Sequence, residues 1–542
     1  MDKRTLLAVV LSAAVMYFFS VYSGTENPKQ TVDVSAQKQE TVTTSASTTS
    51  TGKSSVTSST NNSSTFSDKH EVRVETDLFS AVFSSRGASL KSLTLKKYNE
   101  DISTSSMPVI LGADADPNIS NYSTQATGFN LPVSTIFTSN ADSLKLNGKE
   151  SQQLTFNYVS NQGFTVRKIY TITGDSYGIK LETQVFNNSQ AALVGNIQHI
   201  MTYPAQYKKS DSRFESAGSY LVTKNSLEIT KTSDVEKASK KFDSNVLWAG
   251  FADKFFICSI LAENGSIASV DVKKNQAGFL ESITSSPQLT INPGQSAKIV
   301  NSIFVGPKDI DVLKSQGHSL DKSLDLGWFD FLAMPLLHIL KFFNNYFNNY
   351  GVAIIIITVI IKIIFIPLTH KSYKSMKDMQ KIQPKMAELK ERYKNDRDTM
   401  NRAVMELYRE HKVNPLGGCL PMIVQIPVFF ALYKALMYAI ELRHAHFFMW
   451  INDLSGPDNL FGQMLGLPFV LGPLPLIMGV SMYFQQKLTP TSGDPLQQKV
   501  LLMLPVVFTV MFLSFPSGLV LYWLVNNVLT IAQQIYINKY VS

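Results

Sequence analysis

The sequence predicts a polytopic α-helical membrane protein that also carries a large all-β domain. Two observations predict this fold class. Of the 542 residues, 44% are apolar and only 17% are charged, whereas a soluble protein carries about 25% charged residues. The apolar residues also change in pattern, from short alternating runs after residue 67 to long continuous runs after residue 325. A wholly disordered chain and a purely soluble enzyme are therefore excluded.

The first 66 residues are expected to form a membrane anchor and a linker. Two basic residues precede an apolar run over 6–22, a pattern typical of a secretory signal or of a signal anchor. The run is long enough to cross a bilayer, and its bulky end lacks a small-residue cleavage site, which favours an uncleaved anchor over 1–24. Residues 25–66 are mainly Ser, Thr, Gln and Asn, a composition that predicts a flexible linker.

Residues 67–320 are expected to form an all-β sandwich. Short β-branched and aromatic runs, such as 71–75 and 164–170, are separated by Gly, Asn, Asp and Ser. This period of two with frequent turn residues is typical of half-buried strands. The two cysteines of the chain, Cys258 and Cys419, cannot form a disulfide framework.

The remaining part, 325–542, is expected to be helical and membrane-embedded. Its predicted elements are an interfacial helix over 328–349, transmembrane helices over 352–369, 416–440, 468–486, 500–515 and 519–537, and a helical hairpin over 370–412. Together with the anchor, this gives six crossings. The hairpin is expected to break near Pro384, which starts its second helix. The transmembrane helices expected over 468–486 and 500–515 are short for a hydrocarbon layer of about 30 Å, so we expect a locally thinned bilayer.

The distribution of charge predicts the orientation in the membrane. Segment 370–412 contains twelve Lys and Arg against seven Asp and Glu, and such basic loops stay in the cytoplasm. Six crossings then place both termini in the cytoplasm and the β domain outside. Two interpretations of the hairpin remain open: a solvated basic surface beside anionic lipid headgroups, or a docking surface for incoming chains or the ribosome.

Lys362 is the most informative residue, because it lies inside the apolar run 352–369. A charge within a transmembrane helix costs at least about 2.5–3.5 kcal/mol and marks a functional site by default. The alternative is snorkelling, but His370 is eight residues away. That separation is about 12 Å of helix, which is further than a lysine stem reaches. Thr358, one turn before Lys362, lies on the same face.

Polar residues recur in two further predicted transmembrane helices. Asn526, Thr530, Gln533 and Gln534 share one face of the last helix, and Gln425 lies among apolar neighbours in the 416–440 helix. Such residues commonly join helices by hydrogen bonds. Together with a lysine that has no intramembrane acid, they favour a wet cavity open to the cytoplasm. The alternative is a secondary transporter for a small anion, which would require paired repeats and a counter-ion residue, and the sequence shows neither.

The sequence contains no catalytic, metal-binding or cofactor-binding motif. Walker, GxSxG, HExxH and paired-cysteine patterns are absent, and the pair His444 and His446 has no third ligand nearby. The net charge of +8 is too small for a nucleic-acid-binding footprint. We therefore expect neither an enzyme nor a direct partner of nucleic acid, and no cofactor or metal.

Several segments resemble the YidC/Oxa family in its Gram-negative form, which has a large periplasmic domain. They are Asn-Pro-Leu-Gly-Gly-Cys-Leu-Pro at 414–421, Gln-Ile-Pro-Val-Phe-Phe-Ala-Leu-Tyr at 425–433, Asp-Pro-Leu-Gln-Gln-Lys at 494–499 and Phe-Pro-Ser-Gly-Leu-Val-Leu-Tyr-Trp at 515–523. The resemblance extends into the β domain through Ser-Arg-Gly-Ala at 85–88.

The resemblance implies an insertase and chaperone for inner-membrane proteins, acting alone or beside the Sec translocon. It also implies a β-supersandwich in the periplasm and a five-helix core around a hydrophilic groove that is open to the cytoplasm. The implied partners are nascent inner-membrane proteins, the Sec translocon, the ribosome through the cytoplasmic hairpin, and membrane lipids. The residues expected to line the groove are Lys362, which stands at the position of the family's arginine, Thr358, Gln425, Asn526, Thr530 and Gln533.

Overall fold

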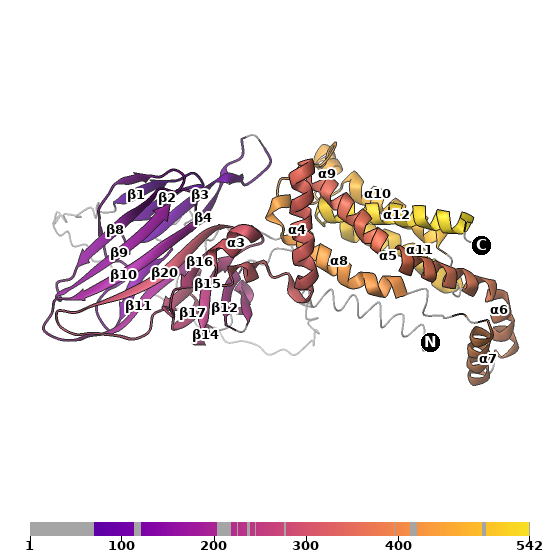
Figure 1. Ribbon diagram of the computed structural model, residues 1–542, viewed down its shortest axis with the longest axis horizontal. Helices are drawn as coiled ribbons and strands as arrows, with labels where there is room; N and C mark the ends of the chain where they lie inside the picture. Colours follow the sequence, from indigo (N-terminus) through magenta and orange to yellow (C-terminus); the bar gives the residue numbers. More distant parts are fainter. Residues whose placement is uncertain are drawn as a thin grey trace, which may run out of the picture. The chain divides into compact units, whose positions relative to one another are not determined.

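The computed structural model describes residues 70–103, 105–112, 121–202, 218–224, 226–235, 239–243, 245–275, 278–394, 396–411, 413, 420–489 and 495–540. The expected anchor, the linker and the motif residues 414–419 lie outside the described residues. The described residues form β-sheets first and helices afterwards (Figure 1). The predicted succession of a β-rich part and a helical part is therefore confirmed.

The described residues of the β-rich part form three sheets. A five-stranded sheet has the order β4 (Pro108–Gly112), β3 (Ser89–Asn99), β2 (Phe79–Ser84), β1 (Glu71–Glu75) and β7 (Ser143–Lys145). A nine-stranded sheet has the order β13 (Leu227–Lys231), β12 (Gly218–Thr223), β15 (Val246–Ala252), β16 (Phe256–Ala262), β20 (Ser296–Pro307), β10 (Gly178–Asn187), β9 (Phe164–Thr173), β8 (Ser151–Val159) and β6 (Thr138–Ser139). The six-stranded sheet contains β14 (Lys240–Asp243), β17 (Ser269–Lys274), β18 (Leu280–Ser285), β11 (Leu193–Thr202) and β19 (Leu289–Ile291), and β5 (Ser123–Thr127) also pairs with β11.

Alternating side chains build the core between the sheets. In β9, Phe164, Val166 and Tyr170 are all buried, because every second residue of a strand points to the same face. The centroid of the Tyr170 ring lies 4.8 Å from that of Phe83 in β2, and the Tyr170 hydroxyl donates a hydrogen bond of 2.6 Å to the carbonyl oxygen of Ala88. These contacts join the five-stranded sheet to the nine-stranded sheet.

The helical part carries most of the long apolar segments. Its helices are α3 (Ile310–Gln316), α4 (Asp330–Phe347), α5 (Tyr350–Lys381), α6 (Gln383–Arg392), α7 (Arg397–Glu410), α8 (Leu420–Tyr438), α9 (Leu460–Leu465), α10 (Pro473–Leu488), α11 (Pro495–Phe512) and α12 (Ser517–Tyr540), and the short α2 (Thr232–Val235) lies among the strands. Within the described ranges, only α5 is long and apolar enough to cross a membrane. Shorter apolar stretches cover Ile423–Tyr438 and Leu502–Phe512. The six crossings stay a prediction.

Segment 370–412 contains one break more than the sequence predicts. We expected helices over 371–383 and 385–412, with Pro384 at the start of the second helix. Helix α5 ends at Lys381, and no glycine or proline interrupts it after Pro367. Pro384 lies in the first turn of α6, where its missing N–H would have no helical partner in any case. A second break precedes α7, where the Asp396 side chain accepts a hydrogen bond of 3.1 Å from the backbone N–H of Thr399 and caps the helix.

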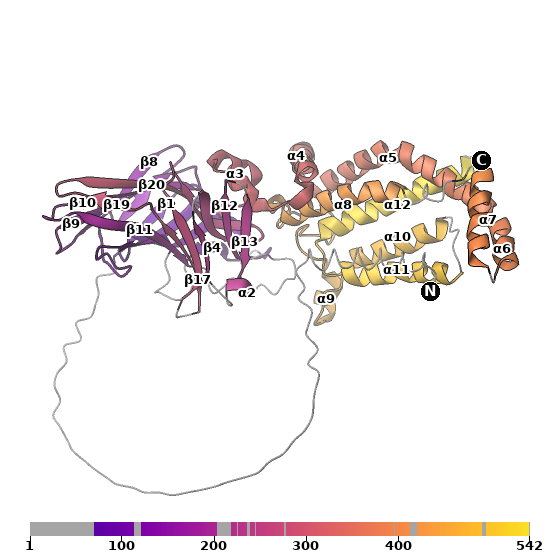
Figure 2. The ribbon, with the colours of Figure 1, turned by 90° about the horizontal axis from the view of Figure 1, so that it is seen from below.

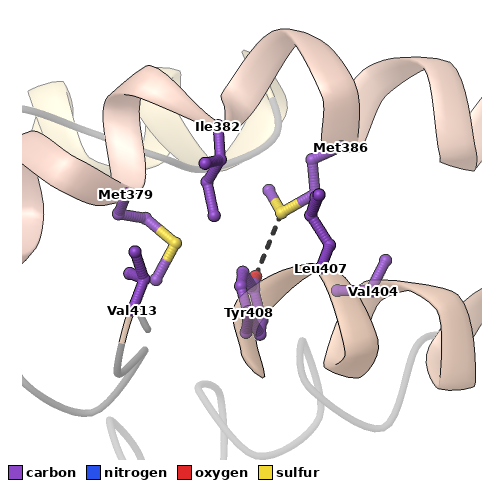
Figure 3. Packing of buried hydrophobic residues seen from close by; sticks show 7 residues of the cluster. All are labelled: Met379, Ile382, Met386, Val404, Leu407, Tyr408 and Val413. Carbon is purple, nitrogen blue, oxygen red and sulfur yellow. Dashed lines mark hydrogen bonds between the residues drawn. The ribbon is translucent and has the colours of Figure 1, made fainter. Parts of the chain in front are cut away.

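A small apolar core joins the α6–α7 hairpin to the end of α5 (Figure 3). Its residues are Met379, Ile382, Met386, Val404, Leu407, Tyr408 and Val413. The α7 members recur at the spacing i, i+3, i+4, which gives this charged helix one apolar face. The Tyr408 hydroxyl also donates a hydrogen bond of 3.0 Å to the sulfur of Met386. The hairpin is thus a packed unit attached to α5.

Helix α12 lies between α5 and α10, and α11 lies beside α10 (Figure 2). At Gly479, α10 and α11 approach so closely that a Cβ atom would lie 1.9 Å from the hydroxyl oxygen of Thr509. Helix α8 contacts both α4 and α5. This arrangement gives α12 neighbours on several sides.

Candidate functional site

The site is centred on Lys362 in α5. Its ammonium nitrogen donates a hydrogen bond of 2.6 Å to the hydroxyl oxygen of Thr530 in α12, and the Thr530 hydroxyl in turn donates a bond of 2.6 Å to the carbonyl oxygen of Asn526. The lysine side chain is half-buried. No carboxylate of the described residues lies within ion-pair distance of it. Lys362 is therefore held by a neutral hydroxyl, and its positive charge is not neutralised by a neighbouring acid.

Two further polar contacts of α12 lie on either side of this pair. The Gln425 amide of α8 donates a hydrogen bond of 3.3 Å to the side-chain oxygen of Asn526. The Gln533 amide donates a bond of 2.6 Å to the hydroxyl of Thr369 in α5. The structure thus links four of the six predicted groove residues, Lys362, Thr530, Asn526 and Gln425, through consecutive hydrogen bonds among α5, α8 and α12. Gln533 makes a separate contact between α12 and α5, and together these contacts form the polar cluster.

Thr358 is placed differently from the other predicted groove residues. It is buried, with 1% of its surface exposed, and its hydroxyl donates a hydrogen bond of 2.7 Å to the carbonyl oxygen of Ile354 in the same helix. It lies one turn before Lys362 on the same face of α5. Its polar group is therefore satisfied within α5.

Three polar residues of the bundle were not predicted from the sequence. Thr369 accepts the bond from Gln533, and the Asn527 amide of α12 donates a bond of 2.9 Å to the hydroxyl of Ser481 in α10. Thr369 lies eleven residues, or about three turns, after Thr358. Following the helical face of Thr358 and Lys362 further along α5 would therefore have identified Thr369 from the sequence. Asn527 points about 100° away from Asn526 around the helix axis, and the sequence does not show which neighbour occupies that side.

The cluster supplies hydrogen-bond donors, hydrogen-bond acceptors and one positive charge. A lysine ammonium has three N–H donors, and one of them is used by Thr530. The free donors and the surrounding amides can hydrogen-bond peptide groups and attract carboxylates inside an otherwise apolar bundle. Among the described residues there is no cluster of three or more His, Cys, Asp and Glu that could hold a metal ion.

Comparisons with known proteins agree with this architecture. The family model described as 60Kd inner membrane protein matches residues 342–542, and the model of the YidC periplasmic domain matches 71–339. The chain is 61% identical to the membrane protein insertase YidC of Pelobacter propionicus over the full length of both proteins. It is 49% identical to that of Geobacter metallireducens, over 100% of this chain and 99% of the relative.

Among solved structures, the chain is similar to a crystal structure of an active YidC insertase with the first transmembrane domain resolved. The TM-score is 0.36 at 18% identity, with 87% of this chain and 93% of the other chain covered. A β-rich periplasmic domain followed by a helical inner-membrane core defines the class of non-enzymatic membrane protein insertases. The chain belongs to the YidC family of membrane protein insertases. The resemblance seen in the sequence is therefore confirmed.

Proposed function

We propose that this chain inserts proteins into the inner membrane, and assists their folding, through a hydrophilic groove formed by α5, α8 and α12. The observation that carries the proposal is the contact of 2.6 Å between Lys362 and Thr530, in which a membrane-embedded cation has a neutral partner. A purely structural charge in such a place would be expected to pair with a carboxylate. The polar cluster around it supports the same function, because it can solvate a polar segment within the bilayer.

We call a protein that is being inserted a client. Its inserting part consists of an apolar segment and a short polar stretch beside it, the flank, and the groove acts on the flank. Lys362 attracts acidic groups of that flank, and the amides of Gln425 and Asn526 replace part of its hydration. The apolar client segment then moves sideways into lipid, where its burial supplies the free energy. The membrane potential adds about 2.3 kcal/mol per charge per 100 mV for acidic residues that cross outwards. No nucleotide is required.

The partners follow from the proposed orientation, with six crossings, both termini in the cytoplasm and the β-rich part in the periplasm. The basic α6–α7 hairpin faces the cytoplasm, where nascent chains arrive from the ribosome and where anionic lipid headgroups lie. Clients reach the groove either directly or from the Sec translocon beside it. The short helices α10 and α11 thin the bilayer next to the groove and shorten the path of the flank.

Complementation of an insertase-depleted strain tests the role of Lys362. We expect Lys362→Ala to slow insertion of a small client about tenfold, which corresponds to about 1.4 kcal/mol, and Lys362→Arg to restore it, because arginine keeps the charge. Lys487→Ala is the matched control, since Lys487 is an exposed cation at the end of α10. Normal insertion of every client by Lys362→Ala would contradict the proposal.

Site-specific photocrosslinking tests whether clients contact the groove. A photoreactive residue at Asn526 should crosslink to a nascent membrane protein. Val528, on the opposite side of α12 and 52% exposed, is the matched control. Crosslinks of equal yield from both positions, or from Val528 alone, would contradict a groove among α5, α8 and α12.

A further inference from the structure

Gln534 in α12 is a buried amide with no protein partner. Only 1% of its surface is exposed, and neither its side-chain oxygen nor its side-chain nitrogen hydrogen-bonds any group of the described residues. Leaving a buried polar group unpaired costs about 1–3 kcal/mol. Polar side chains within membrane-spanning helices face the bundle interior or a water-filled cavity.

The position of Gln534 on the helix places it on the α10 side of α12. It lies seven residues, or two turns, after Asn527, and Asn527 hydrogen-bonds Ser481 of α10 at 2.9 Å. The two side chains therefore point in nearly the same direction. The residues of α12 that contact the groove helices α5 and α8 are instead Asn526, Thr530 and Gln533. Helical spacing groups Gln534 with Asn526, Thr530 and Gln533, but its direction is nearer to that of Asn527. Gln534 therefore lies at the contact between α10 and α12, which we call the α10–α12 seam.

The end of the seam carries a further amide on α10. Helices α10 and α12 run in the same direction (Figure 2), so the residues that follow Ser481 lie level with those that follow Asn527. Gln485 is four residues after Ser481 on the same face of α10, and it is partly exposed. The seam therefore has a polar pair in the middle, a buried amide further along and a partly exposed amide at its end.

We propose that this half of the α10–α12 seam is a binding site for water, with Gln534 as its inner wall. Buried waters make about three hydrogen bonds to polar groups that are otherwise unpaired, and the Gln534 amide offers both donors and an acceptor. Water enters the seam beside Gln485, and the water site extends as far as the hydrogen bond between Asn527 and Ser481. Polar solvation then reaches α12 from two sides, through the groove and through the seam.

Thiol labelling tests this site without any client, so its outcome is separable from that of the proposed insertase function. In a chain with Cys258→Ser and Cys419→Ser, Gln534→Cys is labelled in open membrane fragments by a small membrane-impermeant methanethiosulfonate. Val520→Cys is the matched control, because Val520 is seven residues before Asn527 on the same side of α12 and is equally buried, at 1%. We expect the thiol at position 534 to react at least tenfold faster than the thiol at 520. Equal rates would overturn the proposal.

Substitution by leucine is an independent test, which stands even if the cysteine variant fails to assemble. In a hydrated seam, Gln534→Leu exposes an apolar side chain to the bound water, so the thermal midpoint in detergent stays unchanged or falls. In a dry seam the same substitution removes an unpaired amide and raises the midpoint. Val520→Leu serves as the control for a change of volume in the same seam. A raised midpoint for Gln534→Leu alone would overturn the proposal.

Discussion

At the scale of single residues, the choice of partner decides what a buried cation can do. Lys362 is bound by the Thr530 hydroxyl at 2.6 Å, which supplies one acceptor and no negative charge. Lysine acts as a compact point charge, whereas arginine presents a planar fork that binds carboxylates through two bonds. Lys362 therefore suits attraction of acidic groups in varied geometries, rather than one fixed bidentate contact.

The Thr530 hydroxyl is predicted to stabilise the lysine in place. Thr530→Val has the same shape but leaves the Lys362 ammonium without its acceptor, which should cost about 1–3 kcal/mol of unfolding free energy. Thr530→Ser keeps the hydroxyl and should stay within about 1 kcal/mol of the wild type. Thermal unfolding of the purified chain in detergent measures both. Equal stabilities for the two variants would show that the contact contributes nothing.

The β-rich part contains a buried basic pair that the sequence did not predict. His199 and Lys168 are both buried. Burial, together with the nearby Lys168 charge, lowers the pKa of His199 well below its ordinary 6.5. The His199 Nδ1 atom lies 3.2 Å from the hydroxyl oxygen of Thr124, and the Lys168 ammonium donates to the carbonyl oxygen of Tyr122. The fold thus favours the neutral imidazole.

This burial predicts that stability falls at acidic pH. The unfolded chain protonates His199 below about pH 6.5 while the folded chain keeps it neutral, so the contribution of His199 to stability is complete above that pH and is lost as the pH falls. The loss is about 1.4 kcal/mol per pH unit until the folded pKa is reached. His199→Gln should remove this dependence. Denaturant unfolding at pH 7.5, 6.5 and 5.5 measures it, and identical pH slopes for the variant and the wild type would contradict the assignment.

At the scale of elements, α5 connects two sites. One helix, Tyr350–Lys381, carries Lys362 in the bundle and Met379 in the hairpin core. Because α5 is continuous between Lys362 and Met379, the hairpin is attached to the helix that carries Lys362. The orientation of the hairpin relative to α5 depends on the few contacts in the hairpin core. The α6–α7 hairpin is therefore expected to unfold locally without unfolding the bundle.

The hairpin core is predicted to be a separate unit of stability. Leu407→Ala removes a buried side chain from α7 and should destabilise the hairpin by about 2–5 kcal/mol. Met405→Ala is the control, because Met405 is 54% exposed on the same helix. Hydrogen exchange should speed up in α6 and α7 for Leu407→Ala and stay unchanged in α12. Faster exchange throughout α12 would show that hairpin and bundle unfold together.

Periodicity and composition predicted the elements better than their boundaries. Asn526, Thr530 and Gln533 share a face because of helical spacing, so their common location was visible in the sequence. The break near Pro384 was predicted, because proline is favoured in the first turn of a helix, and Pro384 lies there in α6. The second break, before α7, was missed, because the capping role of Asp396 was not recognised in the sequence. Contacts such as that between Asn527 and Ser481 depend on which helices become neighbours, which no local pattern encodes.

At the scale of the whole molecule, α12 is the central polar element of the helical part. It hydrogen-bonds α8 through Asn526, α5 through Thr530 and Gln533, and α10 through Asn527. Every residue of the proposed groove lies in this part.

The insertion rate of matched clients into proteoliposomes tests the role of the Lys362 charge most directly. Two versions of one small client are compared, with either two acidic or two neutral polar residues in the short flank. The wild-type chain should insert the acidic client several-fold faster than the neutral one, and Lys362→Arg should preserve this preference. Lys362→Met should insert both at equal rates. An undiminished preference for the acidic client in Lys362→Met would contradict the account.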